Sequence, residues 1–221
     1  MAGIRSEPLD IAAHDLRAPL TNIRSYAEVA LARGGPLPPT ARRALEVIVR
    51  NADRALALIQ DGFDAWRGEE GIDLVPSPFS LGDLLAEAAI RPVADRLAER
   101  GIQLRLEVEP GLPDLRADRR RLARVLELLL DRAAGRAPEG STIQAFARTE
   151  GRSQLFGVAD QGAPPPEGEA FDLPASVVRE HRLDSGLALP LARVVARAHG
   201  GDAELRHEGP GCACVVRLPS S

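Results

Sequence analysis

The sequence predicts an α+β protein in which an N-terminal helical hairpin, joined to a second copy as a four-helix bundle, is followed by a two-layer α/β sandwich. Two observations lead to this fold class. Apolar residues in the first third of the 221-residue chain recur at spacings of 3 and 4, which is typical of amphipathic helices. From Phe79 onward, stretches with helical periodicity alternate with stretches that read as strands. We therefore divide the chain into a hairpin of residues 1–67, a linker of residues 68–78 and a sandwich of residues 79–221.

The predicted hairpin consists of two helices around a turn rich in Gly and Pro at residues 34–39. Thr40 is a candidate N-cap of the second helix. One hairpin cannot bury both apolar stripes by itself, so we expect a homodimer. The stripes consist of Leu16, Leu20, Ile23, Ala27 and Ala30 in the first helix, and of Leu45, Ile48, Ala52, Ala55, Ile59 and Phe63 in the second.

The sandwich is predicted from five strands and three helices. The expected helices are residues 81–97, 119–134 and 187–198, and the expected strands are residues 102–108, 141–148, 154–159, 202–206 and 212–218, with a Pro-rich loop at 161–169. Cys212 and Cys214 share one face of the last strand, and we expect buried thiols there rather than a disulfide or a metal site. His199 precedes two glycines at the end of the last helix, where a cation suits the helix dipole, and we favour a structural role for it.

The composition narrows the classes of function. The net charge is −4 and all 28 basic residues are Arg, so the chain lacks the excess positive charge of a nucleic-acid-binding surface. No apolar stretch approaches the roughly 20 residues of a membrane-spanning helix, and the N-terminus has no signal-peptide core. We expect a cytoplasmic protein that neither binds nucleic acid nor spans a membrane.

His14 is the leading candidate for a reactive side chain. It lies about 180–240° around the helix from the apolar stripe, so its imidazole is expected to face solvent. Asp15 can accept a hydrogen bond from one ring nitrogen and leave the other as a nucleophile. Pro19, inside the same helix, is expected to bend it near His14.

The segment His14–Asp–Leu–Arg–Ala–Pro–Leu–Thr21 resembles the phosphoacceptor box of two-component histidine kinases. The resemblance covers nearly the whole chain: Arg116–Ala133 is similar to the start of the kinase's ATP-binding domain, Asp160–Gln161–Gly162 to its first glycine box, and Gly186–Leu189 with Ala198–Gly201 to its second glycine box and the region after it. The resemblance implies a dimerization and phosphotransfer hairpin followed by an ATPase sandwich of the GHKL type.

The same resemblance implies partners and roles for the phosphoacceptor box. His14 would carry the phosphoryl group beside Asp15, and Arg17, Ala18 and Thr21 would meet the receiver domain of a response regulator. Many members of the family have Thr or Asn at the position of Ala18 to hold the water that dephosphorylates the regulator. Because an Ala side chain cannot hold water, strong phosphatase activity is not expected.

The departures from the family pattern fall in the ATP site. The family's two Asn residues, whose oxygens hold Mg²⁺, correspond to Leu128 and Arg132. The chain keeps Asp160, Gly162 and Gly186 of the two glycine boxes. In the family, the carboxylate at the position of Asp160 recognises adenine, and here it would do so or else have only a structural role. The other glycine positions are occupied by Ala163–Pro164, Asp184 and Ala188. We expect weak or absent binding of ATP and Mg²⁺. Any retained nucleotide site would use Arg132, Asp160, Gly162 and Gly186, and no metal ligand is assigned.

Three functions remain open from the sequence. The first, which we place ahead, is a histidine phosphotransferase that exchanges a phosphoryl group between His14 and an Asp of a receiver domain, with an upstream histidine kinase as a further partner. The second is an ATP-dependent kinase with a divergent site, in which Arg132 contacts phosphate in place of part of the role of Mg²⁺. The third is a scaffold that binds a regulator without catalysis.

Overall fold

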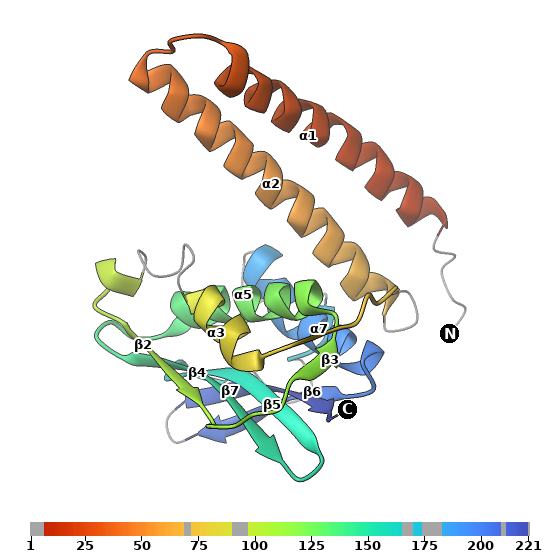
Figure 1. The fold of residues 1–221 in the computed structure, drawn as a ribbon, viewed down its shortest axis with the longest axis vertical. Coiled ribbons are helices and arrows are strands. Elements are labelled where there is room, and N and C mark those ends of the chain that lie inside the picture. The colour runs from red at the N-terminus through yellow and green to blue at the C-terminus, as the bar shows by residue number, and fades with distance from the viewer. Residues whose placement is uncertain are drawn as a thin grey trace. The chain divides into compact units, whose positions relative to one another are not determined.

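The computed structural model describes residues 7–68, 72–89, 97–164, 170–173, 183–208 and 211–220. The chain forms two compact units, residues 1–67 and residues 68–221. The first is a helical hairpin and the second is a mixed α/β sandwich, which confirms the predicted fold class (Figure 1). Each unit is described separately below.

The hairpin consists of helices α1 (Glu7–Arg33) and α2 (Pro39–Arg67), which run antiparallel (Figure 1). Ala27 and Ala52 are buried, and side chains of this size let two helix backbones approach closely. Arg24 Nε lies 3.0 Å from Asp53 Oδ1, an ion pair that joins the two helices at one register. At the end of α1, the Gly34 amide bonds the Ala30 carbonyl, and Gly35 follows with a φ of 69° that favours glycine.

Two local predictions for the hairpin need correction or qualification. Thr40 is not the N-cap, because α2 begins one residue earlier at Pro39 and the Arg42 amide bonds the Pro38 carbonyl at 3.0 Å. The fixed φ of proline suits the first position of a helix, where no amide hydrogen is needed. Pro19 lies inside α1, and the helix continues through it for fourteen more residues to Arg33.

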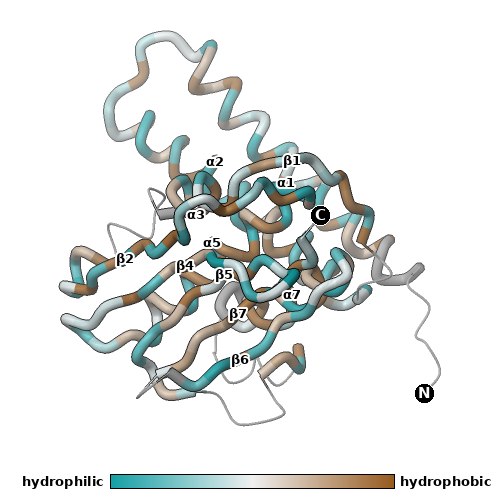
Figure 2. The backbone as a smooth tube through the Cα atoms, turned by 60° about the horizontal axis from the view of Figure 1, so that its bottom comes forward, coloured by the Kyte–Doolittle hydropathy of each residue, from teal (hydrophilic) through white to brown (hydrophobic). Residues whose placement is uncertain are grey.

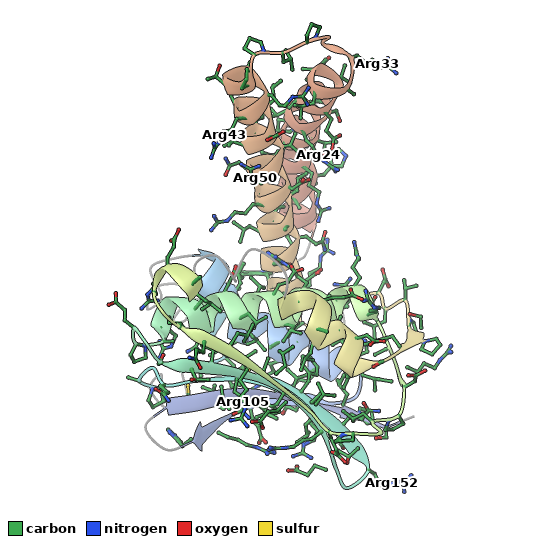
Figure 3. The ribbon with its side chains drawn as sticks, turned by 60° about the vertical axis from the view of Figure 1, so that its left-hand side comes forward. Arg24, Arg33, Arg43, Arg50, Arg105 and Arg152 are labelled. Carbon is green, nitrogen blue, oxygen red and sulfur yellow. The ribbon has the colours of Figure 1, made fainter. Side chains whose placement is uncertain are left out.

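Large apolar side chains of the hairpin remain exposed. Leu16 and Ile23 of the predicted stripe are each about half exposed, at 52% and 50%, and Tyr26 is more exposed still. Hydrophobic and hydrophilic segments alternate along both helices (Figure 2). Arg33, Arg43 and Arg50 project from the hairpin away from its helix contact (Figure 3). The hairpin therefore presents apolar and charged side chains to its surroundings side by side.

The second unit is built on a five-stranded sheet with the strand order β2-β4-β5-β7-β6. The pair β2–β4 is parallel, and the other three pairs are antiparallel. A parallel pair requires a crossover, which here contains helix α5. The strands are β2 (Gln103–Val108), β4 (Thr142–Glu150), β5 (Ser153–Asp160), β6 (Asp202–Glu208) and β7 (Gly211–Pro219).

Three helices cover one face of this sheet: α3 (Leu81–Ala89), α5 (Arg119–Arg136) and α7 (Leu183–Ala198) (Figure 1). The core between helices and sheet is dominated by aliphatic side chains with no measurable exposure. Among them are Leu122, Val125, Leu126, Ile143, Leu187, Val216 and Leu218, and the aromatic Phe156 is equally buried. Within the described part of the chain, no helix is both long and apolar enough to cross a membrane.

The structure adds a small sheet to the predicted sandwich, and two of the predicted segments extend beyond the described residues. Strands β1 (Ser77–Phe79) and β3 (Leu115–Ala117) form a small antiparallel sheet, so part of the expected linker is a strand. The helix expected at 81–97 is described as α3 only to Ala89, and residues 90–96 lie outside the described residues. Residues 165–169 of the predicted Pro-rich loop also lie outside them.

Candidate functional site

His14 presents its imidazole to solvent from α1. Its side chain is 83% exposed, which confirms the predicted orientation, while the preceding Ala13 is buried. His14 Nδ1 lies 3.4 Å from Asp15 Oδ1. A carboxylate next to Nδ1 favours the tautomer that carries its hydrogen there, which leaves a lone pair on Nε2. This geometry suits nucleophilic attack by Nε2 on an incoming group.

The other predicted residues of the phosphoacceptor box divide between solvent and helix α2. Ala18 and Thr21 are exposed, whereas Arg17 is half-buried and donates from Nη2 to Gln60 Oε1. Gln60 in turn donates from Nε2 to Asp64 Oδ1 at 2.8 Å. Sequence reasoning missed Gln60 and Asp64, because Gln60 lies 43 residues from Arg17 and only the hairpin brings them together.

In the sandwich, Arg132 and Asp160 face each other from α5 and the end of β5. Both side chains are 3% exposed, and Arg132 Nη1 lies 3.9 Å from Asp160 Oδ2. Asp160 Oδ1 accepts a hydrogen bond from the Gly162 amide at 2.7 Å. Each carboxylate oxygen of Asp160 thus faces a donor of the protein itself. The structure brings together three of the four predicted nucleotide-site residues: Arg132, Asp160 and Gly162.

Gly162 is held closely against α5. A Cβ at this position would lie 2.7 Å from Asp160 Oδ1 and 3.0 Å from the Arg136 carbonyl oxygen, so only glycine fits. Gly186, the fourth predicted residue, is buried in the first turn of α7. The side chain of Asp184 lies outside what the structure describes, and Ala188 is buried.

The residues of α5 do not fit a Mg²⁺ ion. Leu128 is 1% exposed within the apolar core and has no oxygen to offer. Arg132, one turn further along α5, is a cation without an acceptor atom. Mg²⁺ requires oxygen ligands in octahedral geometry, and this helix face supplies an alkyl group and a positive charge in their place.

Cys212 and Cys214 are free, buried thiols on β7, as predicted. Burial raises the pKa of the Cys214 thiol to about 12. Burial is also the largest cause of the raised pKa of Cys212, and the nearby Asp160 carboxylate adds to it. Both thiols are therefore protonated at neutral pH and are poor nucleophiles.

Asp118 connects three parts of the sandwich. Its carboxylate caps α5 by accepting from the Arg121 amide at 3.1 Å and also accepts from the Val75 amide at 3.0 Å. Its own amide donates to His199 Nε2 at 2.9 Å. His199 Nδ1 lies 2.8 Å from the Val195 carbonyl oxygen, a bond in which Nδ1 carries the hydrogen. Both ring nitrogens of His199 are thus used in hydrogen bonds within the sandwich, which supports the structural role favoured from the sequence.

The comparisons with known proteins agree with this division into two units. Residues 5–71 match the family of His Kinase A (phospho-acceptor) domains. Along 98% of its length the chain is 31% identical to the alginate biosynthesis sensor protein KinB of Pseudomonas aeruginosa. The hairpin carries a His Kinase A (phospho-acceptor) domain, and the whole chain is similar to the histidine kinases of two-component signalling. Over 99% of its length, this histidine kinase relative is 30% identical to the histidine protein kinase DivJ of Caulobacter vibrioides.

The chain spans 37% of the length of KinB and 38% of the length of DivJ. Its fold is similar to that of full-length ShkA in complex with AMPPNP, with a TM-score of 0.73 and 24% identity over 99% of this chain and 46% of ShkA. It is also similar to the kinase ThkA in complex with the response regulator protein TrrA, with a TM-score of 0.58 and 17% identity over 97% of this chain and 61% of ThkA. These likenesses show the shared fold.

Proposed function

We propose that this chain is a histidine phosphotransfer protein that accepts a phosphoryl group on His14 and exchanges it with an Asp of a response regulator receiver domain. The observation that carries the proposal is the contrast between the two candidate sites. The His14 imidazole is exposed and its Nε2 is available, whereas the Asp160 carboxylate faces Arg132 and Gly162 of its own chain.

The transfer step needs no group beyond His14 and the phosphorylated receiver. The Nε2 lone pair attacks phosphorus while the bond between phosphorus and the aspartyl oxygen breaks, and the receiver regains a carboxylate. Nδ1 keeps its hydrogen and the ring becomes cationic. The Asp15 carboxylate, 3.4 Å from Nδ1, stabilises that positive charge.

Weak use of ATP follows from the chemistry of the second site. A nucleotide that bound at Asp160 would compete with the buried Arg132 guanidinium for Asp160 Oδ2, and separating the two would leave buried charges less well paired. A Mg²⁺ ion near Arg132 would meet repulsion of a few kcal/mol, which corresponds to roughly two decades or more in metal affinity. Both effects weaken binding of ATP and Mg²⁺.

The alternative function is an ATP-dependent sensor kinase with a rewired site. It is favoured by one observation, namely that the similar curated proteins KinB and DivJ are named as a sensor protein and a histidine kinase. In this account Arg132 would leave Asp160 and contact a phosphate. A scaffold without catalysis is the third account, and it requires that His14 never carries a phosphoryl group.

One experiment separates the three functions. The full chain is incubated either with a phosphorylated receiver or with labelled ATP and Mg²⁺, and acid-labile label is followed in the wild type, in His14→Gln and in Leu128→Asn with Arg132→Asn. The relay predicts label from the receiver alone, lost in His14→Gln. If the wild type is strongly labelled from ATP and the double change abolishes that label, the protein is a kinase. If neither source labels the protein, the scaffold function is the one that remains.

We also propose a homodimer formed through residues 5–67 and a receiver domain as the partner. The exposed apolar side chains of the hairpin support the dimer, and the complex of ThkA with TrrA gives a structural precedent for the receiver. Ala18, exposed four residues after His14, offers no hydrogen-bonding atom to a water. We therefore infer that the protein returns phosphoryl groups to a receiver rather than hydrolysing them.

A further inference from the structure

A chain of hydrogen bonds ties the phosphoacceptor box to α2. Arg17 Nη2 donates to Gln60 Oε1, and Gln60 Nε2 donates to Asp64 Oδ1 at 2.8 Å. Gln60 and Asp64 are four residues apart, which is one turn of α2. The neutral Gln60 thus stands between a cation on α1 and an anion on its own helix.

The amide of Gln60 has one orientation that satisfies both neighbours. Its oxygen must face the Arg17 guanidinium, which has only donors, and its NH₂ group must face the Asp64 carboxylate, which has only acceptors when ionised. A flipped amide would set donor against donor and acceptor against acceptor. Gln60 therefore holds Arg17 with a neutral acceptor whose direction is fixed by Asp64.

Arg17 is also a neighbour of the reactive side chain. It follows His14 by three residues on α1, a spacing at which side chains lie on adjacent turns about 5–6 Å apart at Cβ. A phosphoryl group on His14 would add close to two negative charges and three acceptor oxygens at this place. Such a group attracts a guanidinium more strongly than an amide oxygen does.

We propose that Gln60 is a positioning residue that holds Arg17 on α2 until a phosphoryl group arrives at His14. Arg17 then exchanges the amide oxygen of Gln60 for phosphoryl oxygens. The neutrality of Gln60 makes this exchange favourable, because a carboxylate at the same position would retain the guanidinium. The inference rests on the proposed function of His14 and assigns a role to a residue outside the phosphoacceptor box.

The test uses phosphoramidate as the phosphoryl donor, so that no receiver or nucleotide is needed. His14 Nε2 attacks the phosphorus of phosphoramidate, the bond between phosphorus and nitrogen breaks, and ammonia leaves. Labelling rates of the full chain are measured for the wild type, for Gln60→Glu and for Gln60→Met. Gln60→Met is the matched control, because it keeps the length and helix preference of the side chain but cannot hold Arg17.

We expect Gln60→Glu to label His14 roughly tenfold more slowly than the wild type, because a charged hydrogen bond is the stronger one to break. Gln60→Met should label at least as fast as the wild type. The same two changes are then made together with Arg17→Ala. In that background the difference between them should vanish, which a merely structural role of Gln60 would not produce.

Two outcomes would overturn the role of Gln60 alone, and a third would overturn the proposed function as well. Equal labelling of the wild type, Gln60→Glu and Gln60→Met on His14 would overturn the role of Gln60 and leave the proposed function intact. A difference of the same size with and without Arg17 would overturn it as well. If the wild type takes up no more label than His14→Gln, the proposed function fails and the inference fails with it.

Discussion

The two units of this chain treat their apolar and reactive side chains in opposite ways. In the hairpin, Leu16, Ile23 and Tyr26 are half exposed or more, and the His14 imidazole lies in solvent. In the sandwich, the aliphatic side chains between sheet and helices are buried, and the Arg132–Asp160 pair is buried with them. One unit has apolar surface left to interact with other molecules, and the other encloses its apolar core within itself.

This difference indicates which contacts stabilise each unit. Two helices share a narrow contact, so the hairpin needs a further apolar surface to bury its stripe. The sandwich closes its own core between one sheet and three helices. Substitutions should therefore act on association in the hairpin and on unfolding in the sandwich, and the following predictions test this division.

The largest effect on unfolding is expected for Leu128→Ala in α5. Removing this fully buried side chain should lower the free energy of unfolding of the sandwich by about 2–5 kcal/mol. Urea unfolding followed by circular dichroism measures the change. Trp66, the only tryptophan of the chain, lies on α2. The urea concentration at the midpoint of its fluorescence transition should therefore be unchanged. The matched control is Leu106→Ala in β2, a leucine that is 40% exposed, with an expected loss below about 1 kcal/mol. Equal losses for both leucines would contradict the described core.

The largest effect on association is expected for Ile23→Glu in the hairpin. Each buried Ile contributes about 1.5–3 kcal/mol, and a symmetric dimer loses two, so the dissociation constant should rise by two decades or more. Sedimentation at micromolar concentration should show about twice 23.6 kDa for the wild type and 23.6 kDa for the variant. Arg50→Glu, at an exposed position that projects from α2, is the control and should remain dimeric (Figure 3). A wild type that is monomeric with an intact hairpin would refute the dimer.

A smaller effect is expected for Asp118→Ala in the sandwich. The change removes the cap of α5 and the acceptor of the Val75 amide, so the free energy of unfolding should fall by about 1–2 kcal/mol. Asp118→Asn keeps one side-chain oxygen as an acceptor and should lose less. Both are measured in urea by circular dichroism. If Asp118→Ala unfolds like the wild type, the cap contributes nothing.

The smallest effect is expected for Glu150→Gln at the end of β4. Hydrogen bonds from Arg206 and then from Arg217 hold the pKa of Glu150 below its ordinary value. A lowered pKa in the folded state gives stability that is present above the pKa of the unfolded chain, near 4, and is lost as the pH falls through the folded value. Thermal melts should therefore separate Glu150→Gln from the wild type at pH 7, and the separation should shrink as the pH is lowered toward 3. A difference that persists unchanged at pH 3 would contradict this origin.

Periodicity explains how much of the fold was predictable. The 3 and 4 spacing of the hairpin and the apolar face of α5 are local patterns, and both helices and the long strands followed from them. The two three-residue strands β1 and β3 have no period of their own, because each is stabilised by the other from a distance of more than thirty residues. Short elements held by remote partners are not visible in a local pattern.

The candidate site divides in the same way. The exposure of His14 could be predicted, because it depends only on the angle between residues of one helix. The bond from Arg17 to Gln60 and the bond from Asp118 to His199 could not, since they join residues 43 and 81 positions apart. Those bonds also decide the hydrogen-bond partners of His199 and the position of Arg17, which no residue type reveals by itself.

The place of β7 in the sheet has a consequence for how the chain is made. This strand, Gly211–Pro219, lies between β5 and β6, and its register pairs Asp160 with Cys212 and Ser153 with Pro219. During translation, β5 is synthesised long before β7, the strand that pairs with it, whereas α1 and α2 are synthesised one directly after the other. The hairpin can therefore form while the sheet of the sandwich is still incomplete and the edge of β5 is unpaired. A translation stop before residue 211 should yield a product that retains a folded hairpin and aggregates through its unfinished sheet.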